Sequence, residues 1–317
     1  MTTESMTEST TSASLARRIP AHDRYPYSPI TTRVGPTWPG GARLAVYVAV
    51  GIEDYHFGDG HTENLLDGVP TPDLVNTSWR DYGNRVGAFR LLGRLERLGI
   101  PPTVLLNTAV YDSAPDLIAE ARRLGAEFVG HGISNSDSLV GLDEESERAY
   151  LSAVSARIEK EEGAAPLGWS SPWLSHTDNT LDLLGETGYG YLLDLRMDDQ
   201  PTWLTTRSQP LLSVPYALEL NDSTSMIGRH VGAAEFADMI IDEFDELLLA
   251  ATPERPLVLS IVVHSFISGA PFRLRQLTRA LEHIAARAGD DVWLTQPRDI
   301  HAVVHAALTT PEVTRHV

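Results

Sequence analysis

Carboxylate and imidazole side chains stand at the ends of three short apolar runs of the chain. Glu53 follows the run Leu44–Val50, His131 ends a second run, and His264 directly follows a third. These are the groups that most often accept and donate protons in enzymes at neutral pH. If the three runs are neighbouring strands, their ends share one pocket. We therefore predict that Glu53 is a general base, that His131 orients or polarises a substrate or binds a metal, and that His264 protonates a leaving nitrogen.

The carboxylate next to Glu53 has a different expected role. Consecutive residues of a strand point to opposite faces, so Glu53 and Asp54 can both reach one pocket only if the chain bends between them. Asp54 is expected to be a metal ligand together with His131, an orienting group, or a cap for the following loop. Because the chain contains no cysteine, any metal must take His, Asp, Glu or Asn as ligands.

Further polar and aromatic residues could contact a substrate. Glycines on both sides of His131 allow the backbone to approach a ligand closely. Arg273 could bind an oxygen-rich substrate through its guanidinium group, or it could pair with a surface carboxylate. Two tryptophans could wall a pocket for a flat or sugar-like ligand, or they could belong to the core. The predicted substrate-binding residues are Asn107, Ser134, Asn135, Trp169, Trp173, Asp199 and Arg273.

Two further histidines lie in a polar loop that is rich in glycine and proline. His56 and His61 belong to the segment Tyr55–Trp79, which follows the first predicted strand. We expect both to be solvated loop residues, and the pattern assigns no role to the loop itself.

The elements that must position these residues are visible in the hydrophobic pattern. Runs that are apolar on both faces alternate with amphipathic helices, which is typical of a parallel sheet covered by helices. We predict an α/β fold, a single distorted (β/α) barrel of about seven strands, which gathers the strand ends at one rim. The predicted strands are Leu44–Val50, Pro102–Asn107, Glu127–His131, Leu167–Trp169, Tyr189–Asp194, Leu211–Val214, Leu257–Val263 and Val292–Leu294.

Two of the intervening helices have specific sequence signals. The segment Val86–Leu95 carries apolar residues at helical spacing, and Phe89 is expected on its buried face. A second helix is predicted to begin with Ser113 as its N-cap and Pro115 in its first turn.

Composition limits the compartment and the partners. Residues 1–20 are Ser/Thr-rich and predict a disordered tail, and residues 21–317 predict one catalytic domain. No apolar run is long enough to span a bilayer, and the N-terminus lacks the apolar core of a secretory signal, so we expect a cytoplasmic protein. The net charge of −18 argues against nucleic acid or an anionic membrane as partner. A homo-oligomer is compatible with the sequence.

Several blocks of the chain resemble the polysaccharide deacetylase superfamily, carbohydrate esterase family four with NodB homology. The similarity runs from about Tyr25 to about Pro297 and is greatest to the branch of cofactor-independent allantoinases and cyclic imide hydrolases. It implies a distorted (β/α) barrel, in agreement with the hydrophobic pattern. The blocks that carry it are Arg80-Asp-Tyr-Gly-Asn-Arg-Val-Gly87, Gly130-His-Gly132, Pro166-Leu-Gly-Trp169, Asp198-Asp-Gln-Pro201 and His264 with Gly269-Ala-Pro-Phe-Arg273.

The chain departs from the metal-dependent members of this family at the expected metal site. Those enzymes carry two adjacent aspartates, which correspond to Glu53 and Asp54, and two histidines four residues apart, which correspond to His131 and Asn135. Asparagine is a poor zinc ligand beside imidazole and carboxylate. The usual Arg-x-Pro motif is also changed, to Trp169-Ser-Ser-Pro172. The resemblance therefore implies a hydrolase without a cofactor, and a single divalent metal such as zinc is the alternative.

Three functions are compatible with these residues. The preferred one is hydrolysis of a non-peptide C–N bond, in which a small cyclic imide or ureide is opened by water. In it Glu53 activates the water, His131 and Asn135 hold or polarise the carbonyl, and His264 protonates the nitrogen. The second is a metal-dependent N-deacetylase of N-acetyl sugars or oligosaccharides, with Asp54 and His131 as ligands. The third is a non-catalytic barrel that binds a small molecule.

Overall fold

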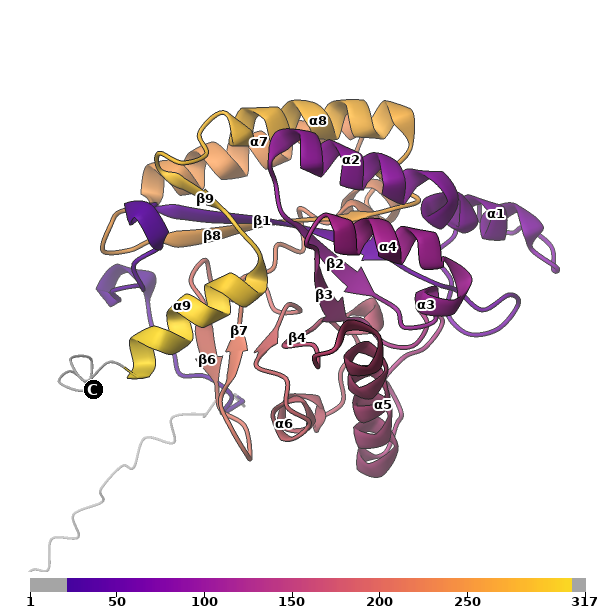
Figure 1. The fold of residues 1–317 in the computed structure, drawn as a ribbon, viewed down its shortest axis with the longest axis horizontal. Helices are drawn as coiled ribbons and strands as arrows, with labels where there is room; N and C mark the ends of the chain where they lie inside the picture. The colour runs from indigo at the N-terminus through magenta and orange to yellow at the C-terminus, as the bar shows by residue number, and fades with distance from the viewer. Residues whose placement is uncertain (1–21, 310–317) are drawn as a thin grey trace, which may run out of the picture.

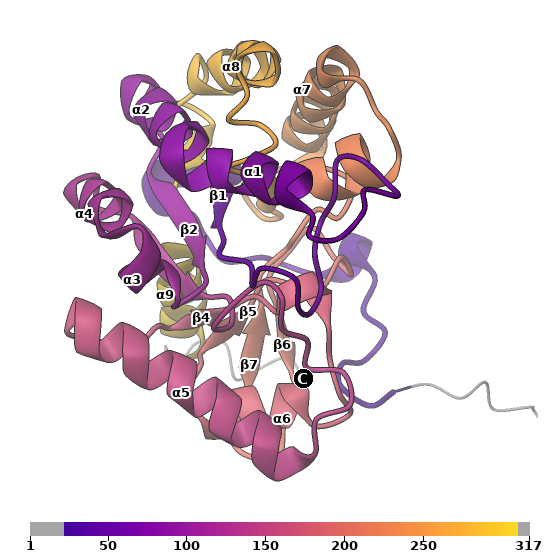
Figure 2. The same cartoon turned by 90° about the vertical axis from the view of Figure 1, so that its right-hand side faces the viewer.

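A curled, mostly parallel β-sheet lies at the centre of the molecule, with helices around its outer side (Figures 1 and 2). The structure is a computed structural model and describes residues 22–309. The predicted tail, residues 1–20, lies outside the described residues. The strands are β1 (Leu44–Ile52), β2 (Pro102–Leu106), β3 (Glu127–Gly130), β4 (Gly168–Trp169), β5 (Tyr191–Leu192), β6 (Thr202–Leu204), β7 (Leu211–Ser213), β8 (Leu257–His264) and β9 (Val292–Leu294).

Helices fill most of the connections between successive strands, since parallel strands need long crossover connections. The α-helices are α1 (Leu74–Tyr82), α2 (Ala88–Leu98), α3 (Val110–Ser113), α4 (Pro115–Arg123), α5 (Glu144–Glu162), α6 (Thr180–Glu186), α7 (Ala233–Ala250), α8 (Pro271–Ala285) and α9 (Pro297–Thr309). Short 3-10 turns occur at Ile30–Thr32, Pro39–Gly41 and Pro172–Leu174, and π-helical turns at Gly83–Gly87 and Ser223–Gly228. Among residues 22–309, no helix combines the length and the apolar character that crossing a membrane demands.

The order of the strands is β6-β7-β5-β4-β3-β2-β1-β8. From β7 to β8 every neighbouring pair is parallel, which gives the distorted (β/α) barrel order that the sequence predicts. β6 is an antiparallel addition at the edge, and β9 pairs with the first residues of β1. The hydrophobic pattern did not predict β6, which has only three residues, two of them partly buried.

The central strand β1 sets the position of the first site residue. It pairs with β8 from Leu44 to Gly51 on one side and with β2 from Val48 to Ile52 on the other. All nine of its residues are buried, which explains why the run is apolar on both faces. Glu53 follows directly, so the carboxylate emerges at the same rim as His264, the last residue of β8.

The segment after β7 closes the barrel on the side of β8. The backbone N–H of Ala217 donates to Ser260 Oγ at 2.6 Å, and the N–H of Val262 donates to the carbonyl of Leu220 at 2.9 Å. These hydrogen bonds hold the segment alongside β8, although the segment does not form a regular strand. They bring Asp222, which follows two residues later, to the end of β8.

The π-helical turn Gly83–Gly87 lies against the chain that follows β8. A β-carbon at Gly83 would stand 2.8 Å from the backbone nitrogen of Phe266, so the contact requires glycine. π-helical turns within helices are frequent at functional sites. Here the turn carries Asn84, whose side-chain amide donates to the carbonyl of Glu53 at 2.7 Å.

Two details of the predicted helices are wrong. Phe89 is 39% exposed, and the buried face of α2 is formed by Ala88, Leu91, Leu92 and Leu95. Phe89 lies next to this buried face and not on it. Ser113 is not an N-cap: it ends α3, and the residue preceding α4 is Ala114, which makes no side-chain cap.

Candidate active site

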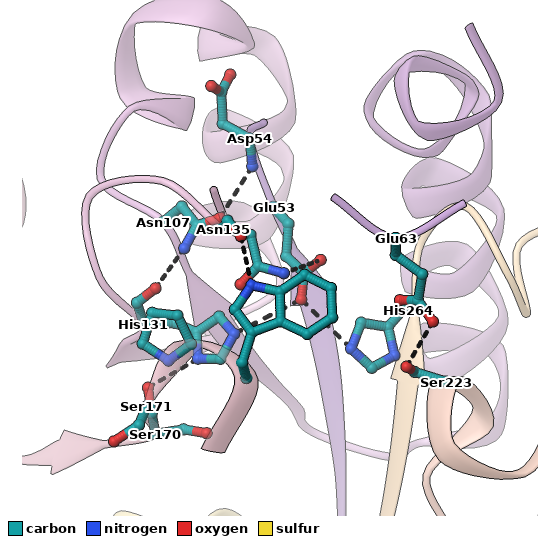
Figure 3. Close-up of polar contacts among 12 residues, drawn as sticks. Glu53, Asp54, Glu63, Asn107, His131, Asn135, Ser170, Ser171, Ser223 and His264 are labelled. Atoms are coloured by element: carbon teal, nitrogen blue, oxygen red, sulfur yellow. Dashed lines mark hydrogen bonds and ion pairs between the residues drawn. The ribbon is translucent and has the colours of Figure 1, made fainter. Parts of the chain in front are cut away.

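A small cavity of about 140 Å³ lies among the carboxyl ends of β1, β3 and β8 (Figure 3). The three residues predicted to carry the chemistry, Glu53, His131 and His264, all line it. The remaining lining residues are Glu63, Leu105, Asn135, Ser171, Trp173, Leu174, Tyr216, Asn221, Ser223 and Thr224.

The Glu53 carboxylate lies between the two histidines. Its Oε1 is 3.6 Å from His131 Nε2 and 3.3 Å from His264 Nε2. Its Oε2 accepts hydrogen bonds from Tyr55 at 2.7 Å and from Asn135 Nδ2 at 3.1 Å. Oε1 is buried and accepts no hydrogen bond within the described part of the chain. One oxygen is therefore held in place, and the other is left to accept a proton.

His264 is held in its orientation by Asp222. The two side chains meet at 2.6 Å between Nδ1 and Oδ1, and Asp222 also accepts from the backbone N–H of His264 at 3.0 Å. Burial by itself lowers the pKa of the His264 imidazole, but the negative charges of Glu53 and Asp222 raise that pKa well above its usual value. The imidazolium form of His264 is thus favoured, and its Nε2 makes an ion-pair contact with Glu53 Oε1 at 3.3 Å that lacks hydrogen-bond geometry.

The same ion pair fixes the state of Glu53. Burial alone would raise the pKa of the Glu53 carboxyl, but the charges and polar contacts of His264 and His131 together outweigh burial and hold that pKa well below the ordinary range. Tyr55 stays neutral beside it, because burial and the nearby charges of Glu53 and Glu63 raise the pKa of the phenol well above its usual value. Glu53 is therefore ionised and His264 protonated over the whole neutral range.

The ring of His131 presents an acceptor to Glu53. Its Nδ1 lies 2.7 Å from the carbonyl oxygen of Ser170, and since a carbonyl only accepts, Nδ1 carries the hydrogen. In the neutral ring Nε2 then carries a lone pair and is a hydrogen-bond acceptor. In this tautomer His131 offers Nε2 as a proton acceptor, and it can polarise a carbonyl by donating to it only when Nε2 is also protonated.

Asn135 is bound to the carboxylate and not free for a substrate carbonyl. Its Nδ2 donates to Glu53 Oε2 and, at 2.8 Å, to the hydroxyl of Tyr55. This fixes the amide orientation, because the opposite orientation would place two acceptor oxygens together. Its Oδ1 is buried without a donor. Asn135 therefore positions Glu53, and it offers only an acceptor to a ligand.

Glycine at position 51 makes room for the histidine of β8. A β-carbon on Gly51 would stand 2.8 Å from Cδ2 of His264 and 3.1 Å from Oε1 of Glu53. Gly51 and His264 are paired across β1 and β8, so a side chain there would push the ring out of line with the carboxylate.

Three predicted site residues lie just behind this cavity. The Asp54 carboxylate points away from His131, in Figure 3, and accepts a hydrogen bond from Ser113 at 2.8 Å. Asn107 accepts from the Asp54 N–H at 3.0 Å and donates to the carbonyl of His131. Ser134 donates to the carbonyl of Asp54 at 2.9 Å. Asn107 and Ser134 thus fix the backbone beside the reacting groups without lining the cavity.

The remaining predictions divide between the rim and places outside the site. Trp173 lines the cavity and donates to the carbonyl of Asn135 at 2.7 Å. Trp169 is fully buried and donates to Ser171 Oγ at 2.8 Å, so it supports the wall from behind. Asp199 pairs with Arg196 at 2.6 Å, outside the cavity.

Arg273 also lies outside the cavity. Its guanidinium stands 5.0 Å from the ring centre of the exposed Phe272. His56 and His61 are exposed, as expected for loop residues, although the ring of His61 lies 5.8 Å from that of Trp173.

Sequence reasoning missed Asp222, Tyr55, Asn84 and Glu63. Asp222 follows a segment with no regular strand pattern and meets His264 from 42 positions away, so no local signal marks it. Tyr55 stands two residues after Glu53 and could have been found by extending the strand-end argument through the bend. Asn84 lies within a quoted family block but was not assigned a role.

The residues present do not fit the zinc site of a metal-dependent deacetylase. Asp54 and His131 do not converge, and Asn135 is bound to Glu53. Across residues 22–309, no three His, Asp or Glu side chains are arranged to hold a metal ion.

Comparison with known proteins agrees with this fold. No family model matches the chain. The "Putative polysaccharide deacetylase" of Schizosaccharomyces pombe (strain 972 / ATCC 24843) is 24% identical over 292 residues, which cover 83% of this chain and 90% of that protein. The crystal structure of Puue allantoinase has a TM-score of 0.78 and 27% identity, covering 91% of this chain and 99% of that chain.

A second crystal structure gives the same result. The "probable Polysaccharide deacetylase" from Pseudomonas aeruginosa PAO1 has a TM-score of 0.74 and 27% identity, covering 86% of this chain and 94% of that chain. In sequence and in fold the chain is therefore similar to polysaccharide deacetylases and to an allantoinase. It is a hydrolase that acts on C–N bonds other than peptide bonds.

Proposed function

We propose that this hydrolase opens a small cyclic imide or ureide by water attack, with Glu53, His131 and His264 as its catalytic residues and without a resident metal. The observation that carries the proposal is the orphaned Oε1 of Glu53, a buried acceptor between two imidazole Nε2 atoms. Buried acceptors without a donor are rare and mark places where a ligand or water completes the site.

Glu53 and His131 together suit activation of the water. Both Glu53 Oε1 and His131 Nε2 are acceptors, so a water can donate one proton to each and turn a lone pair toward the carbonyl carbon. As the C–O bond forms, the proton passes to Glu53. The charge of His264 is one of the causes that lower the pKa of Glu53, so the carboxylate becomes more basic as His264 gives up its proton.

His264 suits protonation of the leaving nitrogen. Its Nε2–H is the one charged donor that lines the cavity. When the C–N bond breaks, the electron pair goes to nitrogen and His264 supplies the proton, leaving a carboxylic acid and a free N–H. Asp222 holds the ring through this transfer.

The Tyr216 hydroxyl, which lines the cavity and accepts from Asn221 at 3.3 Å, can donate to the carbonyl oxygen.

The size of the cavity favours a small ring over a polymer. Drug-sized ligands occupy pockets of roughly 300–1,000 Å³, and this one is about 140 Å³. The absence of the zinc donor set favours chemistry on an imide or ureide, whose carbonyl is a more reactive acyl group than that of an acetamide. These observations support the ring substrate over an N-acetyl oligosaccharide.

A substrate panel tests the proposal. Purified protein is incubated with hydantoin, succinimide, allantoin and N-acetylglucosamine oligomers, and products are followed by loss of the ring amide absorbance and by acetate release. Ring opening without acetate release is the expected result. Acetate release from the oligomers without ring opening would contradict the proposal and support the metal-dependent deacetylase.

Asp222→Asn is expected to lower kcat/KM roughly 10- to 100-fold at neutral pH, as loss of an orienting partner commonly does. It also removes a charge that raises the pKa of His264, so that pKa falls. The active form is protonated His264, and activity is lost as pH rises through its pKa. The alkaline fall of kcat/KM, measured between about pH 5 and pH 10, should therefore begin at lower pH in the variant.

Asp245→Asn is the matched control, since Asp245 pairs with surface His283 at 2.8 Å, outside the cavity. An unchanged alkaline limb in Asp222→Asn, with the melting temperature retained, would show that Asp222 does not set the protonation of His264.

A further inference from the structure

The loop between β1 and α1 sends a single buried side chain into the cavity. Of residues 56 to 73, all of which the structure describes, only Glu63 is buried, although the loop contains the apolar residues Phe57, Leu65 and Leu66. Charged residues are rarely buried without a specific partner. Because this loop exposes these apolar residues and buries its glutamate, its conformation places the Glu63 carboxyl group in the cavity.

Several bonds hold Glu63 in this position. Arg80 donates to the carbonyl of Glu63 at 2.8 Å and to Asn64 at 2.9 Å. The same guanidinium stands 5.1 Å from the ring centre of Tyr55, so one side chain supports both this loop and the donor to Glu53. Ser223 donates to Glu63 Oε1 at 2.7 Å. Figure 3 shows Glu63 on the side of the cavity where His264 lies.

The cavity as a whole is short of donors. Within residues 22–309, Glu53 Oε1 and Asn135 Oδ1 are buried and accept no hydrogen bond, although Oε1 has the ion-pair contact with His264. Neutral His131 offers Nε2 as an acceptor, and Glu63 has a second carboxyl oxygen besides the one that accepts from Ser223. Burial raises the pKa of the Glu63 carboxyl, because its ionised form has lost the donors that water would supply. A ligand that carries N–H groups on more than one side of its ring would supply them.

We propose that Glu63 determines specificity by accepting a hydrogen bond from a second ring N–H of the substrate, the one that does not take part in bond cleavage. This inference rests on the proposed ring-opening function. It makes a ureide ring, with nitrogen on both sides of a carbonyl, a better substrate than an imide ring with carbon at that place.

A structural role for Glu63 has a different signature. If the carboxylate only holds the loop to Ser223, its loss would weaken all substrates equally, and Ser223→Ala would have the same effect. If the Glu63 carboxylate accepts a hydrogen bond from the second ring N–H, its loss affects only the substrates that carry this N–H. Ser223→Ala keeps the carboxylate and removes the loop contact, so it is the matched control.

The experiment compares hydantoin with succinimide, which has CH₂ where hydantoin has the second N–H. We expect the wild type to prefer hydantoin in kcat/KM by roughly 10- to 100-fold, the worth of one hydrogen bond to a charged group. Glu63→Met, which keeps the length of the side chain without an acceptor, should bring the ratio close to one. Ser223→Ala should keep the preference, and 1-methylhydantoin should behave as succinimide does.

The failures are distinguishable. If the wild type opens both rings and Glu63→Met leaves their ratio unchanged, or lowers both rates equally, the inference about Glu63 is overturned and the proposed function stands. If the wild type opens neither ring, the proposed function fails and the inference fails with it.

Discussion

Replacing Glu53 with glutamine is expected to lower kcat for ring opening by about three orders of magnitude, within the range of general acid–base catalysis. The Glu53→Gln variant keeps the shape of the side chain, and its oxygen can still accept from Tyr55 and Asn135. It has no anionic oxygen to take the proton from water. It also removes a charge that raises the pKa of His264, so the acid is weakened at the same time. Steady-state kinetics with hydantoin measure the loss.

The neighbouring carboxylate provides a matched control for this variant. Asp54→Asn removes a charge one residue away, but the Asp54 side chain bonds to Ser113 and does not line the cavity. Its kcat should stay within about twofold of the wild type. A metal-dependent deacetylase would respond in the opposite way, because Asp54 would be a ligand. Retention of more than about one-tenth of the activity in Glu53→Gln would refute the role of Glu53.

Replacing His264 with asparagine is expected to have the second largest effect, a fall in kcat of roughly 10²- to 10³-fold. The variant lacks the charged donor that protonates the leaving nitrogen. It also loses the charge that holds the pKa of Glu53 low, so that pKa rises toward its ordinary value. Activity that depends on ionised Glu53 is lost as pH falls through this pKa. The acid limb of kcat/KM should therefore move to higher pH in His264→Asn.

The control for this variant is a histidine with the same kind of partner on the surface. His283 pairs with Asp245 at 2.8 Å and is far from the chemistry, so His283→Asn should leave kcat and the pH profile unchanged. If His264→Asn kept wild-type kcat, or if its acid limb stayed in place, the ion pair between Glu53 and His264 would not have the function that we assign to it.

Strand ends could be predicted from the sequence because burial on both faces leaves a clear apolar pattern. β1, β2, β3 and β8 begin and end within a residue or two of their predicted limits, and the polar residue after each run marks the rim. That Glu53, His131 and His264 line one cavity follows from this pattern and the parallel order of the strands. The short strands β4 and β5 have two residues each, and β6 at the edge was not predicted.

The supporting residues could not be predicted, because hydrogen bonds between residues far apart in the sequence bring them to the site. Asp222 reaches His264 because the irregular segment after β7 runs along β8, and Glu63 is held in the cavity by Arg80 and Ser223. The tautomer of His131 depends on the carbonyl of Ser170, which no sequence pattern reveals. The Asp54 carboxylate does not point toward His131, as a shared metal would require, because successive residues at the end of β1 point in opposite directions.

The most direct test of the central claim is elemental analysis of the protein purified without a histidine tag, combined with hydantoin hydrolysis in the presence of a strong chelator. Our account predicts less than about one-tenth equivalent of divalent metal per chain and ring opening that the chelator does not change. Near-stoichiometric zinc, together with loss of activity in the chelator, would contradict it and would place a metal where we propose that Glu53, His131 and His264 act alone.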